Sequence, residues 1–249
     1  MTLQQFFTEN PRAALALSGG VDSTYLLYAA AECGADVQPY YVNTVFQPAF
    51  ELADADAVCK MLGFRLKVIP FDVLQDSVVR SNPADRCYTC KTVIFKQIRK
   101  AAEEDGYPLV IDGTNASDDA GDRPGMRALR ELGVRSPLRE CSLTKAEIRR
   151  LSREAELFTA DKPAYACLAT RIQTGMPLTA ERLKTVEQAE QVLFGMGFSD
   201  FRARIREDGT LLQFPESQLP RARDLWPEIV QAMQQFFDKD AIRLDPKGR

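Results

Sequence analysis

The residues of this chain that could do chemistry fall in three groups, of which the most informative is Ser18-Gly19-Gly20-Val21-Asp22-Ser23. This segment lies between an apolar run and a helix-like run, as expected of a turn that joins a strand to a helix. Adjacent glycines allow the backbone to approach an anion, and the amides of a helix N-terminus point at the same place. Ser18 and Ser23 add hydroxyl donors. The segment therefore predicts a phosphate-binding loop.

The loop lacks the lysine that follows the glycines in a Walker motif, so the usual clamp on a γ-phosphate is absent. Asp22 stands where a carboxylate ligand for Mg²⁺ is more useful. The motif resembles the PP-loop of ATP pyrophosphatases, which hold the pyrophosphate end of ATP while a substrate oxygen attacks the α-phosphorus. We therefore expect ATP and Mg²⁺ to bind here and Asp22 to be catalytic. The nucleotide-binding residues expected in this loop are Ser18, Gly19, Gly20, Asp22 and Ser23.

A second group, Asp112-Gly113-Thr114-Asn115, ends another apolar run and is followed by Asp118, Asp119 and Asp122. Ligands of parallel α/β sheets bind outside the carboxyl ends of the strands. This group and the strand end at Asn43 would emerge there beside the PP-loop. Three further residues are therefore predicted to contact the nucleotide, namely Asn43, Gly113 and Thr114. The alternative is a turn whose Asx side chains cap their own backbone.

The third group consists of thiols. The spacing of Cys87 and Cys90 puts two thiols on neighbouring turns of one helical face, where a metal or an iron–sulfur cluster could bridge them. Cys167 could join them by folding, which gives the predicted metal-ligand set Cys87, Cys90 and Cys167. An inert pair of small helix residues and a reducible pair are the alternatives. The chain has no histidine, so zinc sites and acid–base pairs that need one are excluded.

Cys167 lies in the loop-like stretch Pro163-Ala-Tyr-Ala-Cys-Leu-Ala-Thr-Arg171. A nearby cation favours a thiolate, so Cys167 is the predicted nucleophile. Arg171 is predicted to bind the nucleotide, because arginine suits the geometry of phosphate. The alternative for Cys167 is a buried loop cysteine packed beside Leu168. Other arginines near these segments that could neutralise phosphate are Arg123, Arg127, Arg135 and Arg139.

Composition restricts the classes of protein to be considered. The chain has 249 residues, of which 45% are hydrophobic, enough for one large α/β domain and a small appendage. The net charge of −3 disfavours nucleic acid as a partner. A charged-then-apolar leader and an apolar run of about 20 residues are both absent, so we expect a cytoplasmic protein without a membrane partner.

Apolar strands alternate with amphipathic helices through the first two thirds of the chain, which predicts a doubly wound, mostly parallel α/β sheet covered on both faces. The predicted strands are 14–17, 37–43, 65–70 and 109–112, and the predicted helices are 23–33, 49–62, 88–104, 125–132 and 145–155. We assign residues 1–175 to this PP-loop domain and residues 176–249 to a small C-terminal α+β domain.

The C-terminal domain is predicted to contain helices at 181–195 and 225–237 and a hairpin that turns at Asp208-Gly209. Glu187 and Glu190 are spaced i, i+3 on the first of these helices. They could meet a metal, but a solvated helix face is the favoured interpretation. The polar tail at 239–249 is predicted to be mobile.

Together these segments resemble the ATP-dependent sulfur transferase family called LarE, which builds the nickel-pincer nucleotide cofactor of lactate racemase and related enzymes. The matching segments, between roughly residues 10 and 175, are SGGVDS, 85–91, 112–115, 135–138, 143–149 and 166–171. The resemblance implies the fold of adenine nucleotide α-hydrolases. It also implies that ATP adenylylates a carboxylate of a pyridinium mononucleotide and releases pyrophosphate. A sulfur donor then displaces AMP to give a thiocarboxylate.

The resemblance leaves the sulfur source open. In some members the cysteine of the ACL(A/S)xR segment gives up its own sulfur and becomes dehydroalanine, a role that falls here on Cys167. Other members with three active-site cysteines hold a [4Fe-4S] cluster whose open iron carries sulfide, and Cys87, Cys90 and Cys167 fit that count. The resemblance further implies a homo-oligomer, a small-molecule nucleotide substrate, and a sulfur donor or a downstream nickel-inserting protein as partner.

The C-terminal part departs from the family pattern. The family reads R-x-R, then a His-Gly turn and A-R-I-E, whereas this chain has Arg202-Ala-Arg204 and later Asp208-Gly209-Thr-Leu-Leu-Gln-Phe-Pro215. If the missing arginine and glutamate hold substrate, this chain uses other residues, such as Arg221 or Arg223, or acts on a different substrate.

Two other functions stay open on the sequence alone. PP-loop proteins with a CxxC pair and a third cysteine also thiolate tRNA, and salt-dependent binding of tRNA would indicate that function. A non-catalytic module that binds AMP or carries a metal could use the same loop. Such a module would release no pyrophosphate with any acid.

Overall fold

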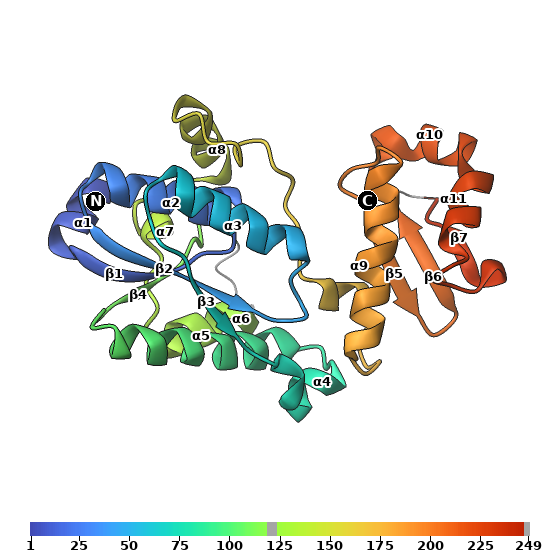
Figure 1. The fold of residues 1–249 in the computed structure, drawn as a ribbon, viewed down its shortest axis with the longest axis horizontal. Helices are drawn as coiled ribbons and strands as arrows, with labels where there is room; N and C mark the ends of the chain where they lie inside the picture. The colour runs from blue at the N-terminus through green and yellow to red at the C-terminus, as the bar shows by residue number, and fades with distance from the viewer. Residues whose placement is uncertain (119–123, 247–249) are drawn as a thin grey trace. The chain divides into compact units, whose positions relative to one another are not determined.

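The computed structural model describes residues 1–118 and 124–246 of the chain, so Asp119, Asp122 and Arg123 lie outside the described residues. The chain forms two compact units (Figure 1), here called the first and the second unit. The first unit is Met1–Val73 with Asp85–Lys162, and the second is Leu74–Ala84 with Pro163–Arg249. In this grouping residues 163–175 fall in the second unit, and the predicted domain boundary after residue 175 stays a prediction.

In its described residues the first unit is a four-stranded, all-parallel sheet with helices on both faces (Figure 1), which confirms the predicted α/β class. The strands are β1 (Arg12–Ala16), β2 (Asp36–Asn43), β3 (Lys67–Pro70) and β4 (Val110–Ile111). They lie in the order β3-β2-β1-β4, so β4 is the direct neighbour of β1. Each of these strands overlaps one of the four predicted strands.

The helices of the first unit include the five that the sequence predicts and two short additional ones. They are α1 (Leu3–Glu9), α2 (Val21–Glu32), α3 (Ala49–Met61), α5 (Arg86–Glu104), α6 (Pro124–Glu131), α7 (Pro137–Glu140) and α8 (Lys145–Glu154). The additional helix α1 begins with a capping box in which Thr2 and Gln5 each bind the backbone amide of the other. A single turn of 3₁₀-helix, η1, spans Val73–Gln75.

The side chains of β1 alternate between two hydrophobic cores, as the pleat of a strand requires. Ala13 and Leu15 belong to the core that contains residues of α2 and α3. Ala14 belongs to the core on the opposite face, with Phe95 and Ile98 of α5. Because both faces of β1 are buried, this strand reads as a nearly continuous apolar run. The sheet is therefore held rigidly between two cores, and the loops that follow its strands carry the predicted site residues.

The second unit is built on a three-stranded mixed sheet in the order β5-β6-β7. The strands are β5 (Arg202–Arg206), β6 (Gly209–Gln213) and β7 (Ile242–Leu244), and β5 with β6 forms the predicted hairpin. The helices are α4 (Ser77–Ser81), α9 (Ala180–Gly195), α10 (Leu219–Asp224) and α11 (Trp226–Met233), with 3₁₀ turns η2 (Leu168–Arg171), η3 (Glu216–Gln218) and η4 (Lys239–Ala241). This sheet and its helices confirm the predicted small α+β part.

The prediction of a mobile tail was wrong for β7. Ile242–Leu244 pairs in parallel with β6, and the side chain of Ile242 is buried. The alternation of Ile242 and Leu244 around Arg243 is the period of a half-buried strand, too short to stand out in a polar tail. In the described part of the chain, no helix is both long and apolar enough to cross a bilayer.

Candidate functional site

The PP-loop leaves the carboxyl end of β1 and leads into α2, as predicted. Gly19 has φ +71°, a left-handed conformation, and a Cβ there would lie 2.8 Å from the carbonyl oxygen of Glu51. The amide of Ser18 donates to Ser23 Oγ at 3.2 Å, and the two hydroxyls lie 3.1 Å apart. Gly20 is the N-cap of α2 and has no side chain to cap the helix. A helix start of this kind suits an anion.

The loop after β4 meets the PP-loop because β4 lies beside β1 in the sheet. A Cβ on Gly113 would lie 2.8 Å from the backbone nitrogen of Ser23, so the two backbones approach as closely as glycine allows. Asn115 reaches the same helix start, where its Nδ2 donates to Asp22 Oδ1 at 3.3 Å. The structure thus brings together the two loops that the sequence places at one edge of the sheet.

The structure gives less direct support to Thr114 and Asn43 as nucleotide-binding residues. Buried Asp112 accepts hydrogen bonds from the Thr114 amide at 3.2 Å, from the Thr114 hydroxyl at 2.6 Å and from Ser136 Oγ at 2.6 Å. These contacts are those of a turn that caps its own backbone. Asn43 is exposed as the last residue of β2. The roles of Thr114 and Asn43 in nucleotide binding stay predictions.

Two lysines from later segments reach the PP-loop, and the sequence reasoning missed both. Lys145 Nζ lies 2.6 Å from Asp22 Oδ2, so each carboxylate oxygen of Asp22 has a donor. Lys162 Nζ donates to the carbonyl oxygen of Gly19 at 3.3 Å and forms an ion pair with Asp54. Positive charge that the loop lacks in its own sequence is therefore supplied from elsewhere in the first unit.

The sequence did contain a signal for Lys145. It is the first residue of α8, directly after the capping residue Thr144. A cation at that end opposes the helix dipole, where an acidic residue would be favourable. A residue that breaks a local rule is a candidate for function. Lys162 breaks no such rule, so only the fold identifies it.

Cys87 and Cys90 lie in the first turns of α5, with Cys87 exposed and Cys90 half-buried. The guanidinium of buried Arg86 lies 3.7 Å from Cys87 Sγ, measured from Nη2. Cys167 belongs to the second unit. Among the residues that the structure describes, no group of three or more cysteine, aspartate or glutamate side chains is placed to hold a metal. The three-cysteine ligand set and its [4Fe-4S] cluster therefore stay predictions.

Half-buried Cys167 precedes η2, and Arg171 at the end of η2 is fully buried. Arg171 Nε and Nη2 donate to the carboxylate of Glu190 at 2.9 and 3.1 Å. Its Nη1 donates to the carbonyl oxygens of Ala166 and Cys167, at 2.6 and 3.4 Å, and to Thr170 Oγ1 at 3.0 Å. All three guanidinium nitrogens thus have partners within the protein, and nucleotide binding by Arg171 stays a prediction.

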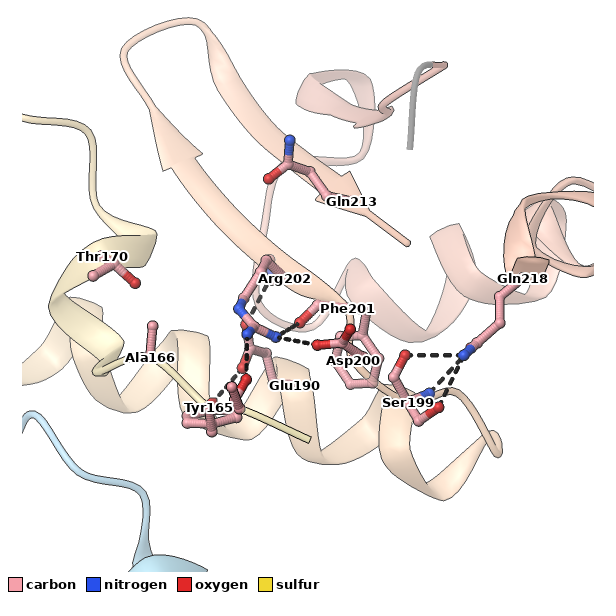
Figure 2. Close-up of polar contacts among 12 residues, drawn as sticks. Tyr165, Ala166, Thr170, Glu190, Ser199, Asp200, Phe201, Arg202, Gln213 and Gln218 are labelled. Atoms are coloured by element: carbon pink, nitrogen blue, oxygen red, sulfur yellow. Dashed lines mark hydrogen bonds and ion pairs between the residues drawn. The ribbon is translucent and has the colours of Figure 1, made fainter. Parts of the chain in front are cut away.

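The prediction of a solvated helix face was wrong for Glu190, which is 1% exposed. Besides Arg171, its carboxylate accepts hydrogen bonds from the Tyr165 hydroxyl and from the Ala203 amide at 3.0 Å. Figure 2 shows Tyr165, Glu190 and Arg202 lying together between α9 and β5. Burial, together with the neighbouring Glu190 carboxylate, raises the pKa of Tyr165.

The two arginines of the R-x-R segment reach the stretch around Cys167. Arg202 is buried and donates from Nη2 to the carbonyl oxygen of Ala164 at 3.0 Å. Arg204 donates from Nη1 to the carbonyl oxygen of Thr170 at 2.7 Å. Both arginines therefore bind backbone carbonyls that flank the cysteine.

The sequence suggested Arg221 and Arg223 as substitutes for the arginine and glutamate that the family pattern expects. Neither belongs to the group of residues around Cys167 and Glu190. Arg221 donates to the carbonyl oxygens of Met196 and Gly197, at 2.7 and 2.8 Å, and packs over the Phe198 ring. Arg223 lines a surface cavity with Trp226, Ile242, Arg243 and Leu244. Arg221 thus has a structural role at the end of α9.

No family model matches the chain. The sequence is 35% identical over 241 residues to an uncharacterized protein of Synechocystis sp., a match that covers 94% of this chain and 88% of that protein. It is 28% identical over 238 residues to an uncharacterized protein of Methanocaldococcus jannaschii, covering 95% and 91% of the two chains.

A third relative is the pyridinium-3,5-bisthiocarboxylic acid mononucleotide synthase of Lactiplantibacillus plantarum. It is 30% identical over 220 residues, which cover 88% of this chain and 80% of that protein. The match extends through most of both units rather than over the PP-loop alone. Identity of this extent shows that the chain belongs to the LarE-type family, to which that synthase belongs.

Proposed function

We propose that this chain is an ATP-dependent sulfur transferase that converts a carboxylate of a pyridinium mononucleotide into a thiocarboxylate during nickel-pincer nucleotide synthesis. The observation that carries the proposal is the 30% identity, over 88% of the chain, to a relative named for the synthesis of a bisthiocarboxylic acid mononucleotide. The geometry of the PP-loop supports a nucleotide-dependent first step.

In the first step a substrate carboxylate oxygen attacks the α-phosphorus of ATP. An acyl–O–P bond forms, the bond from the α-phosphorus to the bridging oxygen breaks, and pyrophosphate leaves with that electron pair. The ammonium groups of Lys145 and Lys162 at the loop would stabilise the charge of the departing pyrophosphate. Asp22 offers the oxygen ligand that Mg²⁺ prefers, and the ion would supply further charge neutralisation when bound.

In the second step the Cys167 thiolate attacks the activated acyl carbon, and AMP leaves to give a thioester. Loss of the Cys167 Cα proton to a base then breaks the bond between Cβ and sulfur. The products are a substrate thiocarboxylate and a dehydroalanine, and no oxidant or reductant is needed. The alternative sulfur source is sulfide on an iron–sulfur cluster, for which Cys87, Cys90 and Cys167 would be the ligands.

The two steps can be tested separately with one variant of each unit. Asp22→Asn should slow pyrophosphate release by about 10²-fold while the fold is retained. Cys167→Ala should release pyrophosphate at the rate of the unchanged protein and form no thiocarboxylate. Full activity of Cys167→Ala would remove this residue from the mechanism. Thiocarboxylate formation by the unchanged protein with supplied inorganic sulfide, on protein that carries iron and with no loss of mass from the chain, would indicate the cluster route instead.

A matched control and two negative outcomes complete the test. Cys33→Ala changes a thiol of α2's C-terminal end and should affect neither step. Absence of pyrophosphate release with the pyridinium mononucleotide would contradict the proposal. Salt-dependent binding of tRNA together with that absence would favour RNA thiolation.

A further inference from the structure

We propose that Arg171 and Glu190 are positioning residues for Cys167. Their buried ion pair fixes the backbone on both sides of the cysteine and so sets the direction in which its thiol is presented. The inference rests on the proposed role of Cys167 in sulfur transfer.

The guanidinium of Arg171 links the two sides of the cysteine. It donates to the carbonyl oxygen of Ala166 before Cys167 and to Thr170 Oγ1 after it. Thr170 is in turn anchored to the cysteine, because its hydroxyl and its amide both donate to the Cys167 carbonyl oxygen, at 2.8 and 2.9 Å. These hydrogen bonds close the backbone around Cys167 into one turn. The Arg171 guanidinium donates to residues on both sides of the cysteine.

Glu190 holds that guanidinium in place. Its two carboxylate oxygens receive Arg171 Nε and Nη2, the bidentate arrangement that orients an arginine in a plane. The Ala203 amide of β5 donates to the same carboxylate, so the ion pair is tied to both α9 and β5. With Arg171 at 0% and Glu190 at 1% exposure, neither side chain has room to swing into solvent.

Tyr165 adds further contacts between the Arg171–Glu190 ion pair and the residues before Cys167; these residues together are called the frame. Its hydroxyl donates to Glu190, and its ring lies under two guanidinium groups, with centroid distances of 4.4 Å to Arg171 Cζ and 5.3 Å to Arg202 Cζ. Figure 2 shows this tyrosine beside Glu190 and Arg202. The backbone two positions before Cys167 is therefore held by the side chain of Tyr165, in addition to the hydrogen bonds that nearby carbonyl oxygens accept.

This arrangement separates a positioning role for Arg171 from nucleotide binding. The charge of Arg171 is already balanced by Glu190, and a phosphate would have to displace that carboxylate from a buried site. If Arg171 bound a phosphate, lysine would keep the charge but lose the bidentate contact, so ATP affinity would fall. If Arg171 positions Cys167, loss of the bidentate contact with Glu190 would lower sulfur transfer and leave ATP affinity unchanged. Arg171→Lys is therefore the variant that distinguishes the two roles.

We expect Arg171→Lys to lower the rate of thiocarboxylate formation by at least about 10-fold, since misplacement by ~1 Å can cost about 10²-fold. Pyrophosphate release and ATP affinity should stay within about 2-fold of the unchanged protein. Alkylation of Cys167, followed by peptide mass spectrometry, should change in rate and in pH profile. Cys87 serves as an internal reference, and Arg182→Lys, which alters another arginine bound to a carbonyl, is the matched control.

A purely structural role is tested by the double variant Arg171→Met with Glu190→Met, and Tyr165→Phe adds a milder change to the same frame. Replacing both members of a buried pair by apolar groups commonly restores stability. If the pair only stabilises the fold, activity should return in the double variant as its thermal midpoint returns. If it positions Cys167, sulfur transfer should stay low in a folded double variant, and Tyr165→Phe should slow transfer more than pyrophosphate release.

Three results would overturn the inference. They are a loss of ATP affinity in Arg171→Lys, recovery of transfer in the double variant, and unchanged alkylation of Cys167 in all variants. The proposed function itself fails in a different way, when the unchanged protein forms no thiocarboxylate. In that case the alkylation rates of Cys167 still decide whether the pair orients its thiol.

Discussion

Lys145 Nζ lies 2.6 Å from Oδ2 of Asp22, although the two residues are 123 positions apart in sequence. The lysine begins α8, and the aspartate is in the first turn of α2. Asn115 donates to the other carboxylate oxygen at 3.3 Å. The ion pair therefore places a cation at a helix start that is built for an anion, and phosphate would compete with Asp22 for that lysine.

If Lys145 serves the phosphates of ATP, Lys145→Met should lower the rate of pyrophosphate release by about 10²-fold, the usual effect of removing one preorganised electrostatic contact. The rate of Cys167 alkylation should not change. Lys60→Met is the matched control, because Lys60 forms an exposed ion pair with Asp56 on α3. A Lys145→Met protein that releases pyrophosphate as fast as the control would contradict the assignment.

The close approach of the two site loops predicts a sharp effect of one methyl group. Gly113→Ala would put a Cβ 2.8 Å from the Ser23 nitrogen, and overpacking of this kind costs about 1–3 kcal/mol. The backbone would also shift at the nucleotide loop, so ATP affinity should fall at least about 10-fold. Calorimetry and denaturant unfolding measure the two effects.

Gly195→Ala is the control for that substitution. Nothing lies within 4 Å of a Cβ at Gly195, the last residue of α9. Alanine there should be neutral or stabilise by up to about 1 kcal/mol, as alanine does in helices. Equal effects of the two substitutions on ATP affinity would show that the loops do not depend on each other.

The edge of the sheet could be predicted because it follows from local patterns. Apolar runs that alternate with amphipathic helices imply parallel strands, and parallel strands end at a common edge. That reasoning placed the loops of Ser18–Ser23 and 112–115 side by side, and the contact between Gly113 and Ser23 confirms it.

The cluster around Cys167 could not be predicted in the same way. Glu190 has the i, i+3 spacing to Glu187 that is typical of a solvated helix face, and only its partner Arg171 explains its burial. That partner lies in an irregular segment, where no periodicity tells which way a side chain points. Lys162 was missed for the same reason.

The thiols should differ widely in reactivity because they differ in burial. Burial raises the pKa of Cys59 to about 12, so almost no thiolate is present near neutral pH. Cys87 is exposed on the first turn of α5. During alkylation of the folded protein, Cys87 should be labelled first and Cys59 only after unfolding. Simultaneous labelling of both, read by peptide mapping, would contradict the core packing around α3.

The half-buried Tyr165 phenol should make stability depend on alkaline pH. Burial beside Glu190 raises its pKa in the folded protein, whereas in the unfolded chain it is near 10. Above about pH 10 the unfolded chain loses this proton while the folded protein keeps it, so the stabilisation is complete below that pH and declines above it.

Tyr165→Phe lacks that titration, so the stability gap between the unchanged protein and the variant should shrink from about pH 9 to about pH 11. Urea unfolding at each pH measures the gap. A gap that stays constant across this range would place the phenol in contact with water instead.

The most direct test of sulfur transfer from Cys167 is the intact mass of the chain before and after incubation with ATP, Mg²⁺ and the carboxylated pyridinium mononucleotide, with iron and sulfide measured on the same anaerobic sample. The account predicts that each chain reacts once and loses the mass of one H₂S, that the loss maps to Cys167, and that thiocarboxylate appears in equal amount. Product without any change in the mass of the chain, or a change in mass that maps elsewhere, would contradict it.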